Sequence, residues 1–266
     1  MTTRDIRQLF WRSEHIPWAE LRSTRHSRQA YKLHQHPQLS IGAIVEGETV
    51  TCCAGKSYHL RAGDMILIGP GVPHSCNPAG GPRSYHMLYL DEQWCKAQLG
   101  LPAFARLHCS QTVLRDVPLF TAFINVLTQM QENNLTALPA ALRGLLFSLP
   151  GLESQACGNP YGEMQQALLA DFQSPPSLES LAKRYHLRKE TLIRHFKQAT
   201  GMTPGAWLNN ARVEFAKARL RAGETLTDVG YQSGFADQSH FHRTFVSFTA
   251  STPRQYAQGR SIFDNN

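Results

Sequence analysis

The feature that most constrains this chain is an internal repeat in its C-terminal half. The first copy is SLESLAKRYHLRKETLIRHFKQATGMTP, residues 177–204, and the second is TLTDVGYQSGFADQSHFHRTFVSFTASTP, residues 225–253. With one residue inserted in the second copy, Leu192 matches Phe241, Arg194 matches Arg243 and Phe196 matches Phe245. Two copies of one pattern predict two copies of one local structure.

Each copy predicts two helices joined by a tight turn. Leu178, Leu181 and Ala182 follow the i, i+3, i+4 spacing of one helix face. The second helix of each copy would bury its aromatic residues and present Arg194 or Arg243 on its outer side. This is the pattern of a helix-turn-helix, whose second helix enters the major groove of DNA. A small all-α domain built from two helical hairpins is the alternative.

The segment AWLNNARVEFAKARLRA between the copies predicts one long helix. Thr203-Pro204 supplies an N-cap and a proline in the first turn, and Gly223 is the expected C-terminal cap. A helix of about 17 residues is roughly 25 Å long. We expect it to hold the two reading helices about one DNA turn, ~34 Å, apart, so that they enter successive major-groove segments.

Length and charge fit a two-domain protein with a polyanionic partner. The chain has 266 residues, a formal net charge of +7 and a pI near 9.2. Charge alone does not locate the DNA-binding half, because residues 160–258 hold 12 Lys+Arg against 8 Asp+Glu and residues 1–159 hold 14 against 11. No long apolar run or secretion signal is present and no two of the six cysteines form a CxxC pair, so we expect a cytoplasmic protein with reduced thiols and no membrane partner.

The N-terminal half changes character along its length. Five short apolar or alternating runs separated by Gly and Pro turns predict an antiparallel sandwich or barrel: residues 42–47, 49–55, 56–60, 64–69 and 84–90. Residues 116–150 predict two helices, with Leu119, Phe123 and Met130 at helical spacing. Residues 151–160 lack periodicity and predict a linker.

The stretches LAKRYHLRKETLIRHFKQATGMTP and GFADQSHFHRTFVSFTASTPRQY resemble the AraC/XylS family of transcription regulators, over about residues 160–258. The resemblance implies a sequence-specific, ligand-responsive DNA-binding transcription regulator and not an enzyme. Activation is the expected mode, and the sequence leaves activation and repression both open. It implies recognition helices from about Lys189 to Ala199 and from about Gln238 to Phe248. The outward residues that it assigns to DNA are Glu190, Ile193, Arg194, Lys197, Gln238, Ser239, His240, His242 and Arg243.

Side-chain chemistry suggests roles for some of these residues. Arg194 or Arg243 could read guanine, Gln238 could read adenine, and Lys197 fits a phosphate contact. Three positions depart from the family pattern: Arg188 replaces a capping Ser, Gly230 a usual Ala, and Ala250 a usual Gly. We expect these to affect local stability more than DNA contact.

A second resemblance concerns a His-x-His pair and a later histidine. His34-Gln-His36 and the segment ending Gly71-Val-Pro-His74 resemble the cupin barrel over about residues 15–92. The resemblance implies an effector pocket with His34, His36, His74 and His86. The segment 37–41 lacks the carboxylate that cupin enzymes add, which disfavours a cupin metalloenzyme but not metal binding. Three interpretations stay open: anchors for a polar organic effector, a zinc or nickel site at His34, His36 and His74 completed by His86 or Cys76, or hydrogen bonds within the barrel mouth.

Together these observations predict an α+β fold with two domains. Residues 1–115 would form a cupin-like effector-sensing domain, 116–150 a helical segment that dimerises or packs on its own barrel, 151–160 a linker, and 161–258 a double helix-turn-helix DNA-binding domain. The expected partners are double-stranded DNA, a small-molecule or metal effector, RNA polymerase and a second copy of the chain; no cofactor is required. A constitutive architectural DNA binder with a vestigial barrel is the remaining alternative.

Overall fold

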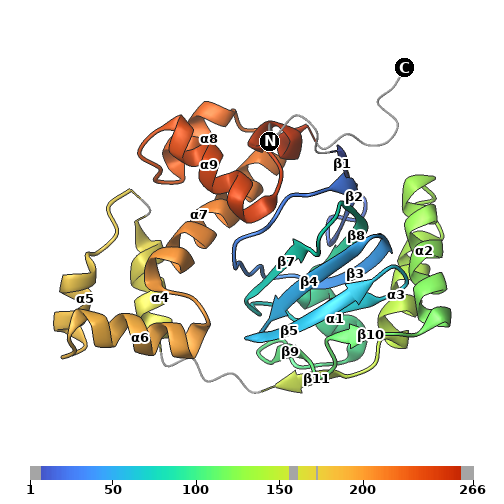
Figure 1. Ribbon diagram of the computed structural model, residues 1–266, viewed down its shortest axis with the longest axis horizontal. Coiled ribbons are helices and arrows are strands. Elements are labelled where there is room, and N and C mark those ends of the chain that lie inside the picture. Colours follow the sequence, from blue (N-terminus) through green and yellow to red (C-terminus); the bar gives the residue numbers. More distant parts are fainter. Residues whose placement is uncertain (1–6, 156–160, 172, 259–266) are drawn as a thin grey trace.

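The computed structural model describes residues 7–155, 161–171 and 173–258, which form a β-rich domain and a helical domain (Figure 1). The two-domain α+β architecture predicted from the sequence is confirmed. In these residues no helix combines the length and the apolar character needed to cross a membrane.

Eight strands make up most of the β-rich domain. They are β1 (Arg7–Trp11), β2 (Ala19–Ser27), β3 (Leu39–Glu46), β4 (Glu48–Cys53), β5 (Lys56–Arg61), β6 (Met65–Ile68), β7 (His74–Pro78) and β8 (Arg83–Leu90). The larger sheet has the order β1-β2-β8-β3-β6-β10, in which β10 is Val113–Leu114, and the smaller one has the order β5-β4-β7, with antiparallel pairing throughout. The five runs predicted as strands are strands, and β1, β2 and β7 are added to them.

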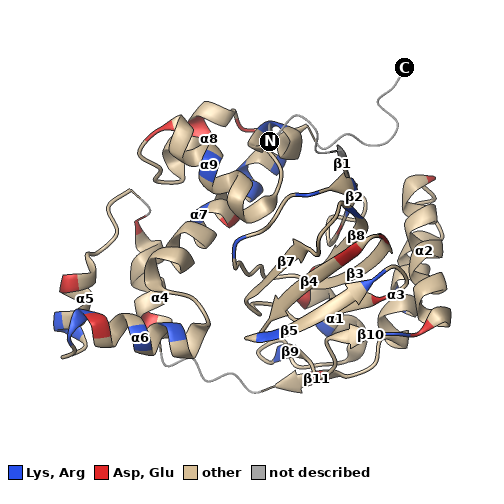
Figure 2. Ribbon diagram, viewed as in Figure 1, with Lys and Arg blue, Asp and Glu red and all other residues tan. Residues whose placement is uncertain are grey.

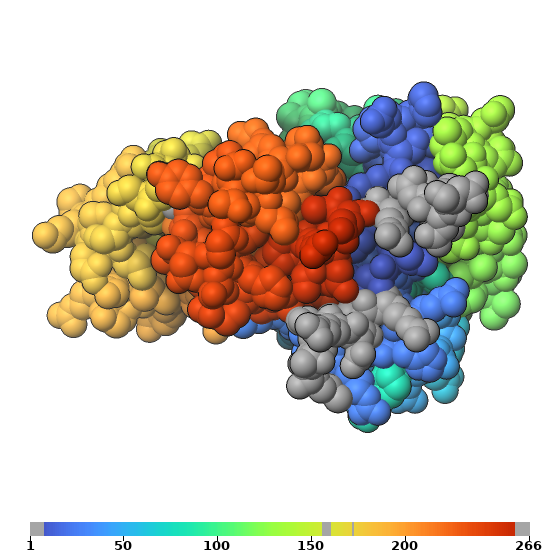
Figure 3. Space-filling model, turned by 90° about the horizontal axis from the view of Figure 1, so that it is seen from above, coloured from blue at the N-terminus to red at the C-terminus, as the bar shows by residue number. Residues whose placement is uncertain are grey.

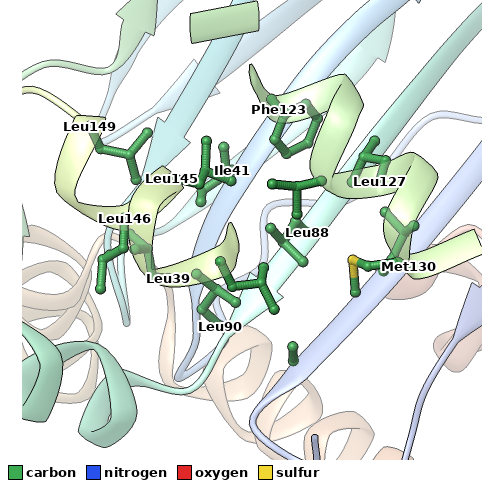
Figure 4. Close-up of a cluster of buried hydrophobic side chains, with 14 of the residues drawn as sticks. Leu39, Ile41, Leu88, Leu90, Phe123, Leu127, Met130, Leu145, Leu146 and Leu149 are labelled. Carbon is green, nitrogen blue, oxygen red and sulfur yellow. The ribbon is translucent and has the colours of Figure 1, made fainter. Parts of the chain in front are cut away.

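Two helices cover the outer face of the larger sheet. After α1 (Glu92–Leu99), β9 (Arg106–Cys109) and β10 (Val113–Leu114) come α2 (Val117–Gln131) and α3 (Leu138–Ser148). Alternate residues of β3 and β8 face these helices, where Leu39 and Leu88 pack in one cluster with Phe123 and Leu145 (Figure 4). The helices predicted in residues 116–150 are therefore confirmed, and their apolar face is buried against their own sheet.

The segment predicted as a linker begins as a strand. β11 (Leu152–Gln155) pairs with β9, with Leu152 opposite Cys109 and Gln155 opposite Arg106. The prediction of a linker from residue 151 was wrong for these four residues. They form a strand because they pair with the backbone of β9, and the local sequence carries no pattern that indicates this partner. Residues 156–160 of that linker lie outside the described residues.

The helical domain consists of two hairpins joined by one long helix (Figure 1). Its helices are α4 (Gly162–Ala170), α5 (Leu178–Arg184), α6 (Lys189–Thr200), α7 (Pro204–Arg221), α8 (Leu226–Gln232), α9 (Gln238–Thr249) and α10 (Pro253–Ala257). Ser177 and Thr225 cap α5 and α8, the first helices of the two hairpins. Thr203 and Thr252 cap α7 and α10, the helices that come after each hairpin. Gly223 follows the α7 cap with φ 85°, so the predicted glycine stop is confirmed.

The two domains share a packed boundary. Phe10 of β1 is buried in the core of the helical domain, with its ring 5.2 Å from that of Tyr256 in an edge-to-face arrangement. Lys32 N–H donates to the Ser247 carbonyl of α9 at 2.9 Å, and Gln8 Nε2 donates to the Ala250 carbonyl at 2.5 Å. Figure 3 shows the orange and red helices directly against blue N-terminal atoms. The DNA-binding candidate α9 is thus in direct contact with the β-rich domain.

Candidate functional site

The second helix of each hairpin buries one side and exposes the other. Leu192 and Phe196 of α6 are buried, as are Phe241 and Phe245 of α9. The predicted DNA contacts lie on the opposite side: Glu190, Arg194, Lys197, Gln238, Ser239, His242 and Arg243 are exposed, and Ile193 and His240 are half-buried. The ranges predicted from the sequence match α6 and α9 to within one residue.

Charge on this surface is mixed (Figure 2). Lys189 at the start of α6 forms an ion pair with Glu179 of α5, whereas Arg194 and Lys197 point outward from α6 with high exposure. On α9, Gln238 Nε2 donates to the Thr227 carbonyl at 3.2 Å, and the His240 ring packs edge-on against Phe235 at 5.3 Å. Gln238 thus uses one of its two Nε2 donors on α8.

The three departures from the family pattern have visible local consequences. Arg188 stands at the N-cap of α6 without a side-chain cap hydrogen bond, as its chemistry dictates. A Cβ on Gly230 would lie 2.7 Å from Gln238 Nε2, so an alanine here would require the flexible end of the Gln238 side chain to move. Ala250 adopts φ 50°, the left-handed conformation that Gly201 adopts at the end of α6 with φ 76°.

Three of the four predicted effector histidines meet at one end of the β-rich domain. His34 pairs with His74 through two backbone hydrogen bonds of 2.9 and 2.8 Å. The ring centroids are 4.3 Å apart for His34 and His74 and 4.8 Å for His36 and His74, and the nearest ligand atoms of the three lie within 4.8 Å of one another. His36 and His74 are buried and His34 is half-buried.

Backbone carbonyls fix the tautomer of each ring. His34 Nδ1 lies 2.9 Å from the Lys32 carbonyl, His36 Nδ1 3.3 Å from that of Gln38, and His74 Nδ1 2.8 Å from that of Val72. Since a carbonyl oxygen only accepts, each Nδ1 must carry the proton and each neutral ring presents an Nε2 lone pair.

Burial keeps these rings neutral. Desolvation lowers the pKa of His74 to about 4, and desolvation followed by the nearby His74 ring lowers the pKa of His34 and His36 well below the usual range. Ser40 Oγ lies 3.2 Å from His36 Nε2. Three neutral imidazoles with Nε2 lone pairs fit a divalent transition metal, because each outer ring nitrogen already has its carbonyl partner.

The fourth predicted histidine lies elsewhere. His86 of β8 faces the α2 and α3 side of the sheet, opposite in parity to Met87, and its Nδ1 lies 2.8 Å from Ser23 Oγ. The structure therefore does not bring His86 to the other three. Cys76, the alternative fourth ligand, lines the interior of the barrel, in one cavity with His34 and His74.

A cavity between the domains adjoins the histidine cluster. It is lined by Arg22, His34 and His36 from the β-rich domain and by Asn210, Lys217 and Tyr256 from the helical domain, among others. Beside it, buried Glu20 accepts hydrogen bonds from Arg12 Nε at 2.7 Å, Tyr256 Oη at 3.3 Å and Arg221 Nη1 at 3.4 Å. One carboxylate of β2 thus holds two elements of the helical domain.

Sequence reasoning missed both buried charges of β2. Glu20 and Arg22 alternate with the apolar Ala19 and Leu21, a pattern that reads as an exposed strand face. The only available signal was that two charged residues at i and i+2 share one face of a strand. Their burial comes from the helical domain, more than 180 residues along the chain.

Known proteins resemble the chain over both domains. Residues 181–259 match a "Helix-turn-helix domain" family and residues 19–150 an "AraC-like ligand binding domain" family. The HTH-type transcriptional activator RhaS of Enterobacter sp. (strain 638) is 39% identical over 94% of this chain and 95% of that protein. RhaS of Klebsiella pneumoniae (strain 342) is 39% identical over 88% and 90% respectively.

Among solved structures, ToxT of Vibrio cholerae strain SCE256, described as bound to an unsaturated fatty acid, has a TM-score of 0.57 at 12% identity and covers 95% of this chain and 94% of that one. ToxT of strain O395 has a TM-score of 0.57 with 98% and 99% coverage, also at 12% identity. These structural matches support the fold. The sequence matches show the family. The chain belongs to the AraC family of transcription regulators.

Proposed function

We propose that this protein is an effector-responsive transcriptional activator that reads DNA with α6 and α9. The observation that carries the proposal is the pair of similar hairpins joined by one helix, α7. The second helix of each hairpin exposes an arginine, and the sensing domain contacts the same helical domain. The names of the full-length relatives support activation.

Specific roles on DNA follow from side-chain chemistry. Arg194 and Arg243 are exposed at corresponding positions of α6 and α9, where a guanidinium can form a bidentate pair with guanine O6 and N7. Lys197, one turn further along α6, suits a phosphate. The helix N-termini add partial positive charge toward the backbone of DNA.

Effector response requires a path from pocket to DNA. The segment with His34 and His36 touches α7 through Gln35 and Asn210, and the preceding Lys32 N–H bonds to Ser247 of α9. A ligand that favours one arrangement of this boundary over another shifts the protein's equilibrium between the two. A ligand that binds both equally changes nothing.

A divalent transition metal at His34, His36 and His74 is a second proposal, favoured by the orientation of the three Nε2 atoms. A bound ion would supply a positive charge beside α7. Zinc or nickel added to EDTA-treated protein should bind at one equivalent in calorimetry, and His74→Asn should abolish that binding. Unchanged metal binding in the variant would remove the proposal.

RNA polymerase and a second copy of the chain are proposed as further partners. Activation implies contact with the polymerase. Val117 of α2 and Phe147 of α3 expose 77% and 59% of their surfaces. In a dimer formed through these helices, both residues would lie in the interface. Light scattering of the wild type against a V117E/F147E double variant tests the second copy, since only a dimer through these helices would dissociate.

The DNA-reading proposal is tested by mapping bound sites in cells. The wild type is compared with Arg194→Ala/Arg243→Ala, and with Arg61→Ala/Arg106→Ala as a control that removes two exposed arginines from the β-rich domain. We expect discrete sites that disappear only in the first variant. Survival of those sites in it would show that other residues read the DNA, and equal binding of scrambled DNA would favour an architectural role.

A further inference from the structure

The two reading helices begin at equivalent residues of opposite charge. The repeat matches Arg188 with Asp237, and each of them is the N-cap of its helix, α6 or α9. Asp237 Oδ1 accepts a hydrogen bond from the His240 N–H of α9 at 2.7 Å. Arg188 also has an extended backbone but no side-chain acceptor, so α6 begins without the side-chain cap that α9 has.

Arginine at this position costs the free protein some stability. The N–H groups in the first turn of a helix need acceptors from outside the helix, and a side-chain oxygen at the N-cap normally supplies one. The partial positive charge at the N-terminus of a helix also opposes a cation placed there. A residue that lacks the cap and carries the unfavourable charge is expected where that charge has a partner outside the chain.

The side chain of Arg188 differs from the cations beside it in having no acidic neighbour. Lys189 forms an ion pair with Glu179 of α5, and Arg184 Nη2 lies 3.7 Å from Glu163 Oε2 of α4. Arg188 is exposed, and within the described part of the chain its guanidinium has no hydrogen bond, ion pair or aromatic contact. The guanidinium can therefore bind an anion without breaking any internal bond.

The turns that lead into α6 and α9 differ in charge along their whole length. Residues 183–189, KRYHLRK, include four Lys and Arg and no Asp or Glu. The equivalent residues 231–238, YQSGFADQ, include one Asp and no Lys or Arg. Both turns have the same place in their hairpins. A nearby polyanion is therefore attracted by the first turn and repelled by the second.

The position of Arg188 on α6 favours the DNA backbone over the bases. At about 100° per residue, Glu190 and Lys197 lie within roughly 60° of Arg194 around the helix axis, whereas Arg188 lies about 120° from it. When Arg194 faces the bases in the major groove, Arg188 faces a wall of that groove, where the phosphates lie.

We propose that Arg188 binds a phosphate of the DNA backbone beside the groove that α6 enters, a contact that the second hairpin lacks. The inference rests on the proposed function, in which α6 and α9 read DNA, and it adds a residue that sets affinity without setting base preference. Asp237 stands at the equivalent place on α9 and repels the backbone. The two hairpins are therefore unequal, and the first contributes more of the affinity and of its salt dependence than the second.

The test measures DNA binding and stability on the same full-length variants. Fluorescence anisotropy over a salt series uses a duplex that contains a site mapped in cells and a scrambled duplex of equal length. Arg188→Ser removes the cation and restores a capping hydroxyl. We expect it to weaken binding to both duplexes by the same factor, about three- to tenfold, and to reduce the salt slope by about one. We also expect it to raise Tm by about 2–4 °C through the new cap.

Two further variants serve as controls. Arg188→Lys keeps the charge, so it should retain the salt slope of the wild type and leave Tm unchanged. Arg61→Ser removes an exposed arginine from the β-rich domain, and it should leave both the affinity and the slope unchanged. A loss of affinity together with a gain in Tm is a result that damage to the fold would not produce.

The other outcomes overturn either the Arg188 contact or the proposed function. Unchanged affinity and slope in Arg188→Ser, or a loss of affinity together with a fall in Tm, would show that Arg188 is solvated or structural. A loss for the mapped site alone would make Arg188 a base-reading residue and overturn the phosphate contact. If the wild type binds both duplexes equally, the proposed sequence-specific function fails, whereas specific binding that Arg188→Ser leaves intact overturns only the Arg188 contact.

Discussion

Asn210 and Gln35 join the two domains through a reciprocal pair of hydrogen bonds. Gln35 N–H donates to Asn210 Oδ1 at 3.0 Å, and Asn210 Nδ2 donates to the Gln35 carbonyl at 2.9 Å. Asn210 is 6% exposed within α7, and Gln35 stands between His34 and His36. The backbone of the His-x-His segment is thus attached to the helix that connects both hairpins.

Replacing Asn210 with Ala should weaken the boundary between the domains. The change removes both bonds and leaves a partly buried N–H and carbonyl of Gln35 without this partner, at a cost of about 1–3 kcal/mol. Scanning calorimetry should then resolve two unfolding transitions that lie further apart than in the wild type. Gln198→Ala, which changes an exposed residue of α6, is the control and should not separate the transitions. A single unshifted transition in Asn210→Ala would mean that this pair does not couple the domains.

A second test concerns the end of α6. A Cβ on Gly201 would lie 2.7 Å from Pro73 Cγ of the β-rich domain, and the residue has φ 76°. Gly201→Ala should therefore cost both left-handed strain, roughly 1–2 kcal/mol, and docking of α6 on Pro73. Gly223 has φ 85°, and a Cβ there would have no atom within 4 Å. Gly223→Ala should therefore lose only the free energy of the left-handed strain. Chemical denaturation should show the greater loss for Gly201→Ala; equal losses would show that Pro73 moves aside freely.

Local patterns explain why the DNA-reading face was predictable. The repeat, the Thr caps and the apolar spacing act within about a dozen residues, and the predicted helices ended within one residue of α6 and α9. The strand runs of the barrel were predictable for the same reason. The prediction that His86 joins the other histidines was wrong. Alternation along the strand could have shown this, because His86 lies on the same side of β8 as the apolar Leu88 and Leu90.

Contacts between distant segments could not be predicted from the sequence. Gln8 bonds to Ala250, Glu20 to Arg221 and Phe10 packs on Tyr256, and no local pattern pairs residues so far apart. Arg22 belongs to this class, because its burial depends on the docked helical domain. The candidate effector site was thus half predictable, through its histidines.

Single substitutions on the reading helices should separate base contact from phosphate contact. Arg243→Ala should cost about 1–3 kcal/mol at the cognate site and relax specificity at one base pair. Lys197→Ala should weaken cognate and scrambled DNA alike and reduce the salt slope by about one. Fluorescence anisotropy over a salt series measures both. A uniform loss for Arg243→Ala, with specificity intact, would reassign it to the backbone, and Arg61→Ala is the exposed control.

The histidine cluster should make stability depend on pH. His74 has its pKa lowered to about 4 by burial, and the pKa values of His34 and His36 are lowered in the same direction. Between pH 6.5, the ordinary value, and pH 4 the unfolded chain therefore binds more protons than the folded one, so the free energy of unfolding falls as the pH falls. For His74 alone the loss is about 3 kcal/mol from pH 7 to pH 4. Urea unfolding of EDTA-treated protein measures it. His74→Asn, whose amide can still donate to the Val72 carbonyl, should flatten the dependence, whereas His242→Asn, which removes an exposed imidazole of α9, should leave it steep. The same slope in all three proteins would show that the cluster takes up protons without unfolding.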